Sequence, residues 1–85
     1  MNGLALIFLY GGDGGRAGVF LNAPRLPTPN DVDDYINSPL KKYMIGWTYR
    51  ISGNTIPIEL RKGDVITGAI VSDSYVVLNF YPYKY

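Results

Sequence analysis

Two kinds of hydrophobic pattern run along the chain. Residues 4–10 form a continuous apolar run, LALIFLY, and residues 17–21 form a second, shorter one. Further on, the period changes to two, with alternation in the segments 47–51 and 56–60, and two mainly apolar segments follow at 65–72 and 75–81. Alternation is typical of a strand with one buried face, whereas a continuous run is typical of a strand buried on both faces. The pattern therefore predicts six strands, with 4–10 at the centre of a sheet.

Between the second and third strands the pattern favours a helix over about residues 29–37. Thr28 is a good N-cap and Pro29 suits the first helical position. Apolar residues follow at helical spacing, and acidic residues occupy the first turns, where the helix dipole favours them. These two sets are Val32, Tyr35 and Ile36, and Asp31, Asp33 and Asp34. Ser38-Pro39 should end the helix.

Glycine, proline, asparagine and aspartate mark the connections. The segment 11–16 predicts a hairpin between the first two strands, and Asp73-Ser74 predicts another between the last two. Pro57 lacks an N–H, which places its strand at a sheet edge or a bulge. We therefore expect one domain, residues 1–85, of α+β class and mostly antiparallel β structure. About six short strands should form a curled sheet or a small barrel, with the helix packed on it.

The periodicity also predicts which side chains build the core. On the last strand, Val76, Leu78 and Phe80 share one face, which should be the buried one. The full predicted core is Leu4, Leu6, Phe8, Val19, Leu21, Val32, Ile36, Trp47, Ile58, Val65, Val76, Leu78 and Phe80.

Composition narrows the chemistry. The 85 residues contain no Cys and no His, which removes the thiolate nucleophile, the zinc–thiolate site and the commonest general base. A net charge of +1 argues against a partner bound mainly through charge, such as duplex DNA or an anionic membrane. We expect no catalytic residue, no metal and no cofactor, and hence a protein that is not an enzyme.

The apolar run near the N-terminus has neither the basic flank nor the cleavage site of a signal peptide, and it is too short to span a membrane. We expect no membrane partner, and a location in the cytoplasm of a host cell or in a virion. From the small, self-contained character of the chain we expect a virus- or phage-encoded accessory, inhibitor or virion protein.

A glycine-rich loop follows the first strand. Residues 12–17, GDGGRA, match G-x-G-x-x-A, but no helix of useful length can follow, so a dinucleotide site is not predicted. We expect the segment Gly11–Gly18 to be a mobile tip that contributes little to folding. Alternatively it holds an anion or a partner through Gly12, Gly14 and Arg16.

The last strand carries a row of tyrosines. Counting by twos, the face opposite Val76, Leu78 and Phe80 consists of Tyr75, Val77, Asn79, Tyr81, Tyr83 and Tyr85. Tyrosine joins an apolar ring to a polar tip and is enriched in recognition surfaces. We expect Tyr75, Tyr81, Tyr83 and Tyr85 to bind a partner, although the rings could instead cover a second small core.

Two functions fit these features. The first is a non-enzymatic interaction module that binds a protein, or itself as a homo-oligomer, through the tyrosine-rich face and a strand edge. The alternative is a binder of single-stranded nucleic acid or of a nucleotide. It would stack bases on the tyrosines and hold phosphate with the glycine-rich loop and Arg16. The near-neutral charge favours the first.

Overall fold

The computed structural model describes residues 2–84, which form six strands, one short α-helix and two 3-10 helices. The strands pair as two three-stranded sheets, and every pairing is antiparallel. Sheet A has the order β4 (Ser52–Leu60), β1 (Gly3–Gly11), β6 (Ser74–Pro82). Sheet B has the order β3 (Met44–Tyr49), β2 (Arg16–Leu21), β5 (Ile66–Val71). The expected fold class and the central position of β1 are confirmed, and the described strands do not close into a barrel.

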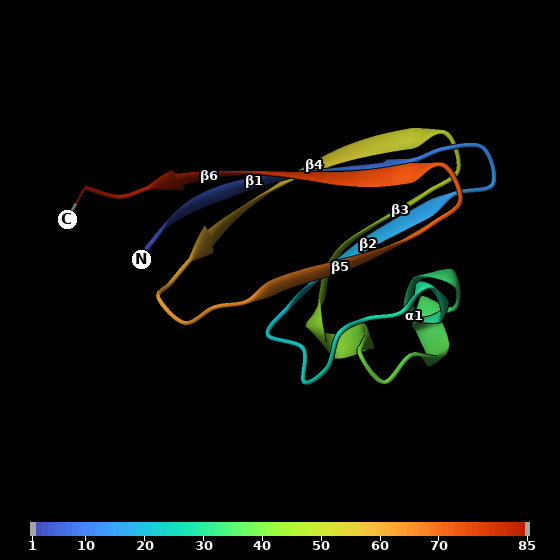
Figure 1. The fold of residues 1–85 in the computed structure, drawn as a ribbon, viewed down its shortest axis with the longest axis horizontal. Helices are drawn as coiled ribbons and strands as arrows, with labels where there is room; N and C mark the ends of the chain where they lie inside the picture. The colour runs from blue at the N-terminus through green and yellow to red at the C-terminus, as the bar shows by residue number, and fades with distance from the viewer. Residues whose placement is uncertain (1, 85) are drawn as a thin grey trace.

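Apart from β2 and β3, strands that follow one another in sequence lie in different sheets. The turns after β1, β3 and β5 each carry the chain from one sheet to the other, and all three turns lie at the same end of the molecule (Figure 1). The hairpins expected between β1 and β2 and between β5 and β6 are therefore wrong, since β2 pairs with β3 and β5, and β6 pairs with β1. Because the two strands joined by each of these turns lie in opposite sheets, their side chains can pack against each other and form a core between the sheets.

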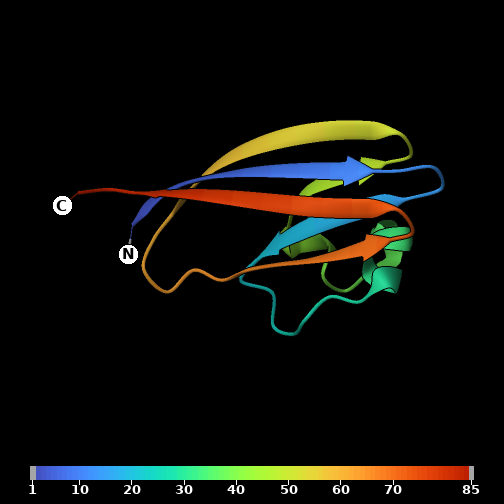
Figure 2. The same ribbon diagram turned by 45° about the horizontal axis from the view of Figure 1, so that its top comes forward.

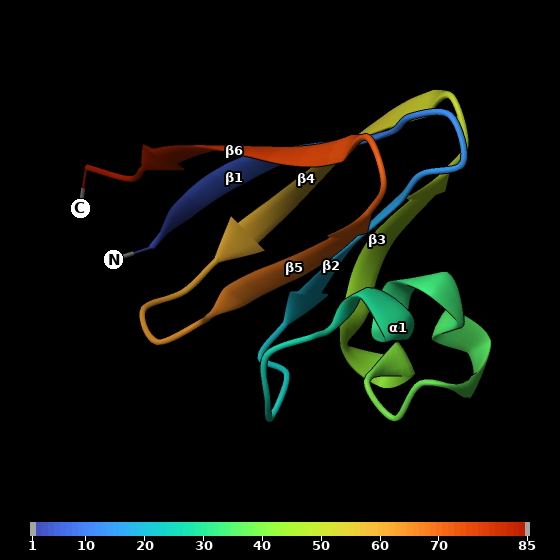
Figure 3. The ribbon, with the colours of Figure 1, turned by 45° about the vertical axis from the view of Figure 1, so that its right-hand side comes forward.

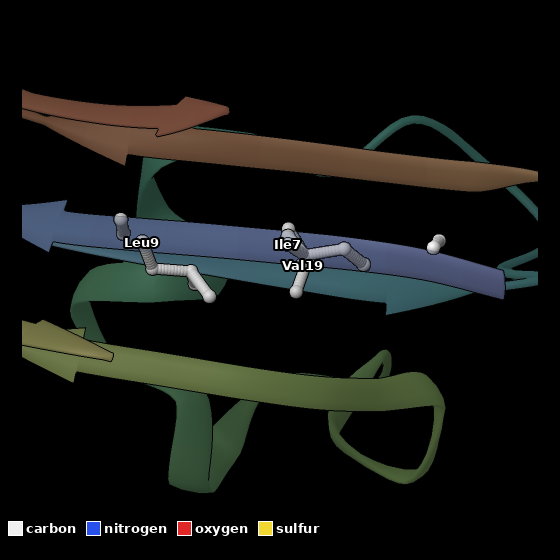
Figure 4. Close-up of a cluster of buried hydrophobic side chains, with 5 residues drawn as sticks. Ile7, Leu9 and Val19 are labelled. Atoms are coloured by element: carbon white, nitrogen blue, oxygen red, sulfur yellow. The ribbon is translucent and has the colours of Figure 1, made fainter. Parts of the chain in front are cut away.

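The inner core fills the space between the two sheets. Ala5, Ile7 and Leu9 of β1 and Ala17 and Val19 of β2 are completely or almost completely buried there, and Figure 4 shows this cluster. Half-buried side chains from the outer strands close it, namely Ile45, Ile56, Ile58, Leu60, Ile66 and Val76. Burial of a large aliphatic side chain stabilises a fold by about 1.5–3 kcal/mol, so this small set supplies much of the stability.

The side chains that β1 contributes to this core are the opposite of those predicted. Leu4, Leu6 and Phe8 lie on the outer face of sheet A and are only half-buried. The run LALIFLY is apolar on both faces, so period two cannot distinguish the inner set from the outer one. Of the other predicted core residues, Val19 and Val32 are buried, while Leu21, Trp47, Ile58 and Val76 are half-buried.

A helical layer covers the other face of sheet B (Figure 3). It consists of α1 (Pro29–Asp33), η1 (Tyr35–Asn37) and η2 (Lys41–Tyr43), so the expected helix begins where predicted but changes to 3-10 geometry after Asp34. Phe20, Val32 and Leu40 form a second buried cluster beneath it. The indole N–H of Trp47 donates to the Val32 carbonyl oxygen at 2.9 Å and ties the layer to β3.

One buried carboxylate organises this layer. Both Asp31 oxygens accept hydrogen bonds from the Arg25 guanidinium, at 2.8 and 2.9 Å. The same carboxylate accepts from the Thr28 N–H at 2.7 Å and from the Ser38 hydroxyl at 2.7 Å. These bonds, led by those from Arg25, hold the pKa of Asp31 well below its ordinary value despite burial. Asp31 therefore links the loop before α1, the start of α1 and the turn after η1.

Four predicted core residues are more exposed than expected, and for two of them the reason is that the two sheets do not match in length. Each strand of sheet A has nine residues and each strand of sheet B has six. The sheets also diverge away from the three turns (Figure 1). Leu78 and Phe80 face inward but remain 42% and 37% exposed. Ile36 lies in η1 and is 62% exposed, and Val65 lies on the connection between β4 and β5 and is 56% exposed.

Candidate interaction surface

The outer face of sheet A carries no covering layer. No described helix or strand packs on it, and the helical layer lies on the far side of sheet B (Figures 1 and 2). The register of β1 against β6 pairs its side chains in four rows, Leu4 with Tyr81, Leu6 with Asn79, Phe8 with Val77 and Tyr10 with Tyr75. A sheet normally buries one face against another element, so a bare and largely apolar face is unusual.

Three aromatic rings cluster at one end of this face. The rings of Tyr10 and Tyr75 stack with their centroids 5.1 Å apart, and Phe8 lies 6.0 Å from Tyr75. Gly53 of β4 leaves room for the Phe8 ring, since a Cβ there would lie 3.0 Å from its Cζ. Tyr75 therefore stabilises the fold as well as presenting an exposed ring.

The tyrosine row lies where the parity of the last strand predicts. Residues 76, 78 and 80 pair with Leu9, Ile7 and Ala5 of the inner face, so the alternate positions 75, 77, 79 and 81 face outward. Tyr75, Tyr81 and Tyr83 are 48%, 54% and 38% exposed. Tyr85 lies outside the described residues. Sequence reasoning missed the half-buried neighbours that β1 adds to this face, Leu4, Leu6, Phe8 and Tyr10.

The backbone of β6 is open along one side. The Tyr83 N–H donates to the Asn2 carbonyl oxygen at 2.9 Å, so odd-numbered residues of this strand turn their backbone groups toward β1. Because these directions alternate along a strand, the N–H groups of Val76, Leu78 and Phe80 point away from β1. Within residues 2–84 no strand pairs with that side. None of residues 74–82 is charged.

The opposite edge of sheet A differs. The same alternation turns the backbone of residue 57 in β4 away from β1, so Pro57 occupies the free edge. Its missing N–H interrupts that edge in the middle of the strand, and Glu59 adds a charge two residues later. The prediction that Pro57 marks an edge strand is confirmed. Only one edge of this sheet is open along its length.

Two hollows flank β6. A groove of about 420 Å³ lies between β5 and β6, lined in part by Val19, Ile66, Ile70 and Val76. A second hollow of about 330 Å³ lies where the sheets diverge, beside Leu78 and Phe80. Both are mainly apolar, and residues of β6 line both of them.

The glycine-rich loop is a packing element. It is shorter than expected, Gly12–Gly15, and its carbonyl groups accept the N–H groups of the turn after β3: Arg50 donates to Gly15 at 2.9 Å and Ile51 to Gly12 at 3.1 Å. A Cβ at Gly12 would collide with the Asp73 carbonyl oxygen. These contacts join all three turns at this end. The expectation that the loop contributes little to folding stays a prediction.

Arg16 lies far from the tyrosine row. Its guanidinium forms an ion pair with Asp33 at 2.9 Å and lies over the Tyr49 ring, 4.7 Å from the centroid. These partners belong to the helical layer and to β3, on the covered side of sheet B. The fold thus places Tyr75 and Tyr81 on one face and Gly12 and Gly14 in the turn at its end. Arg16 follows that turn, but its side chain lies on the covered side of sheet B.

No model of a known protein family, no curated protein and no solved structure matches the chain. Among the described residues, no cluster of carboxylates is suited to hold a metal ion. No helix in residues 2–84 has the length and apolar character needed to cross a membrane.

Proposed function

We propose that this chain is a non-enzymatic module that binds protein through β6 and the adjoining outer face of sheet A. The observation that carries the proposal is the combination of an open strand edge and an uncovered apolar face on the same strand. An edge of this kind binds an extended segment through backbone hydrogen bonds, while flanking side chains give specificity. The virus- or phage-encoded origin stays a prediction from the character of the chain.

The distribution of charge favours protein over nucleic acid as the partner. Arg16, the cation expected to hold phosphate, is paired with Asp33, and Arg25 is paired with Asp31. The charged residue on the outer face of sheet A is Glu59. Because phosphate contacts supply most of the affinity for nucleic acid, this face is poorly suited to a polynucleotide backbone.

The proposal is tested by capture from cells that express the chain together with a second, differently tagged copy. The test variant is Tyr81→Ser, which removes an exposed ring from the face; the control is Ile36→Ser, which removes an exposed side chain from the helical layer. We expect the wild-type chain and the control to retain the same proteins in equal amounts. Tyr81→Ser should bind these proteins at least about tenfold more weakly, equivalent to about 1.4 kcal/mol of binding free energy.

Two results would overturn the proposal. One is equal retention by Tyr81→Ser and the control, or no retained protein at all. The other is salt-dependent binding of a single-stranded oligonucleotide, measured by fluorescence anisotropy, that Tyr81→Ser abolishes, because this would assign the tyrosines to base stacking.

A further inference from the structure

We infer that the segment bound by β6 is β6 of a second copy, paired antiparallel about a two-fold axis at Leu78. This inference rests on the proposed function and names its partner. The result would be one continuous sheet of six strands, in the order β4, β1, β6, followed by β6, β1, β4 of the second copy. A two-fold contact of this kind uses the same patch on both chains and closes without further growth.

The backbone favours this register. With the axis at Leu78, Leu78 lies opposite Leu78 of the second copy, and Val76 lies opposite Phe80 of the second copy. Each of these three residues then uses both its outward N–H and its outward carbonyl group. Ser74 falls opposite Pro82, and neither can donate there: the Ser74 N–H already bonds to the Ser72 carbonyl oxygen at 2.8 Å, and proline has no N–H. The ladder therefore ends where the donors end.

The side chains are compatible with the same register. On the outer face, Tyr75 lies opposite Tyr81 of the second copy and Val77 lies opposite Asn79. Aromatic pairs across neighbouring strands stabilise a sheet, and like charges directly opposite would destabilise it. Residues 74–82 place no charge opposite another, and a net charge of +1 gives two copies little mutual repulsion.

The inner face supplies the additional area that a stable dimer needs. A standard interface buries roughly 800 Å² per partner from about 20–30 residues, about one-seventh of the 5367 Å² that the chain exposes. The nine residues of β6 cannot supply this alone. In the inferred register Phe80 of the second copy lies beside Val76, at the groove of about 420 Å³ between β5 and β6. The Phe80 ring, which leans over Gly3 of its own chain and is 37% exposed, would border the groove of the other copy.

Single cysteines test the pairing, since the chain has none of its own. Directly opposed residues of a hydrogen-bonded pair have Cα atoms about 5.5 Å apart, within disulfide range. We expect Leu78→Cys to cross-link to itself under mild oxidation about tenfold faster than the exposed control Ile36→Cys, because pairing raises the effective thiol concentration. Val76→Cys and Phe80→Cys should each fail alone and cross-link when mixed.

Sedimentation of the cysteine-free chain from about 1 μM to about 1 mM completes the test, with a shift from monomer to dimer expected. A mass that stays monomeric overturns the inference. A dimer in which Leu78→Cys reacts no faster than Ile36→Cys also overturns it, as does faster cross-linking of mixed Val76→Cys and Leu78→Cys, which would reveal a shifted register. None of these results bears on the capture of other proteins, so the proposed function is judged separately.

Discussion

The two sheets are built from similar apolar strands but end up in different surroundings. Sheet B has one face against sheet A and the other beneath the helical layer, where Phe20 is completely buried. Sheet A has one face against sheet B and a bare outer face. On that outer face Phe8, which lies on the central strand as Phe20 does in sheet B, is only half-buried. The 22 residues between β2 and β3 cover one sheet, and nothing in residues 2–84 does the same for the other. The apolar side chains of sheet A are thus available for binding.

The largest expected effect separates the two phenylalanines. Phe20→Ala should lower the free energy of unfolding by about 3–5 kcal/mol, because it empties a closed site between sheet B and the helical layer. Phe8→Ala should cost less than about 2 kcal/mol in the monomer, since its ring is already partly in water. Urea denaturation at low protein concentration measures both. Equal losses would contradict the difference between the two faces.

A second prediction concerns the attachment of the layer that covers sheet B. Asp31→Asn should destabilise the fold by about 2 kcal/mol at neutral pH, because it weakens charge-assisted hydrogen bonds to Arg25. The folded-state pKa of Asp31 is lowered, so its contribution is present above the ordinary value of about 4 and is lost as the pH falls below it. The difference between wild type and variant should therefore shrink from pH 7 to pH 3. A difference that grows on acidification would contradict this assignment.

Several of these features are visible in the sequence. Thr28-Pro29 marks the start of the helix, Pro57 marks an edge, and the alternation from Tyr75 to Tyr81 gives the correct inner and outer faces. Each depends on local chemistry or on strict period two. The succession of strands and helix along the sequence, two strands, a helix and then four strands, follows from the same signals.

Other features depend on contacts that local patterns do not encode. Ser52, Gly53 and Asn54 are residue types typical of turns, yet β4 starts at Ser52. The turn falls at Arg50-Ile51, and both residues have positive φ (45° and 47°). The N–H groups of these two residues bond to the glycine-rich loop, which offsets the unfavourable backbone conformation. The placement of β1 and β2, and of β5 and β6, in different sheets likewise arises from pairing between strands far apart in the sequence.

The third prediction opens the protected edge of sheet A. Pro57→Val restores an outward N–H in the middle of β4, so both edges of the sheet can then pair. We expect species larger than a dimer at concentrations about tenfold lower than for the wild type, measured by light scattering. Thr55→Val is the matched control, because it introduces the same side chain on the same strand and leaves every backbone N–H unchanged. Equal behaviour of the two variants would mean that proline does not protect this edge.

The smallest expected effect is that of Tyr81→Ser on the monomer. Tyr81 is 54% exposed, so its loss should change the free energy of unfolding by no more than about 0.5 kcal/mol while weakening association. Tyr75→Ser should cost more, since Tyr75 also stacks on Tyr10. Thermal denaturation of both variants at low concentration measures the difference. Equal destabilisation would place Tyr81 in the core of the monomer.

Amide hydrogen exchange along β6, followed by NMR at two protein concentrations, tests the open edge most directly. At low concentration the amides of Val77 and Asn79, which face β1, should be protected, whereas those of Val76, Leu78 and Phe80 should exchange freely. At high concentration the last three should become protected. If they are already protected in the monomer, or stay unprotected while the dimer forms, β6 is not the open pairing edge of this protein.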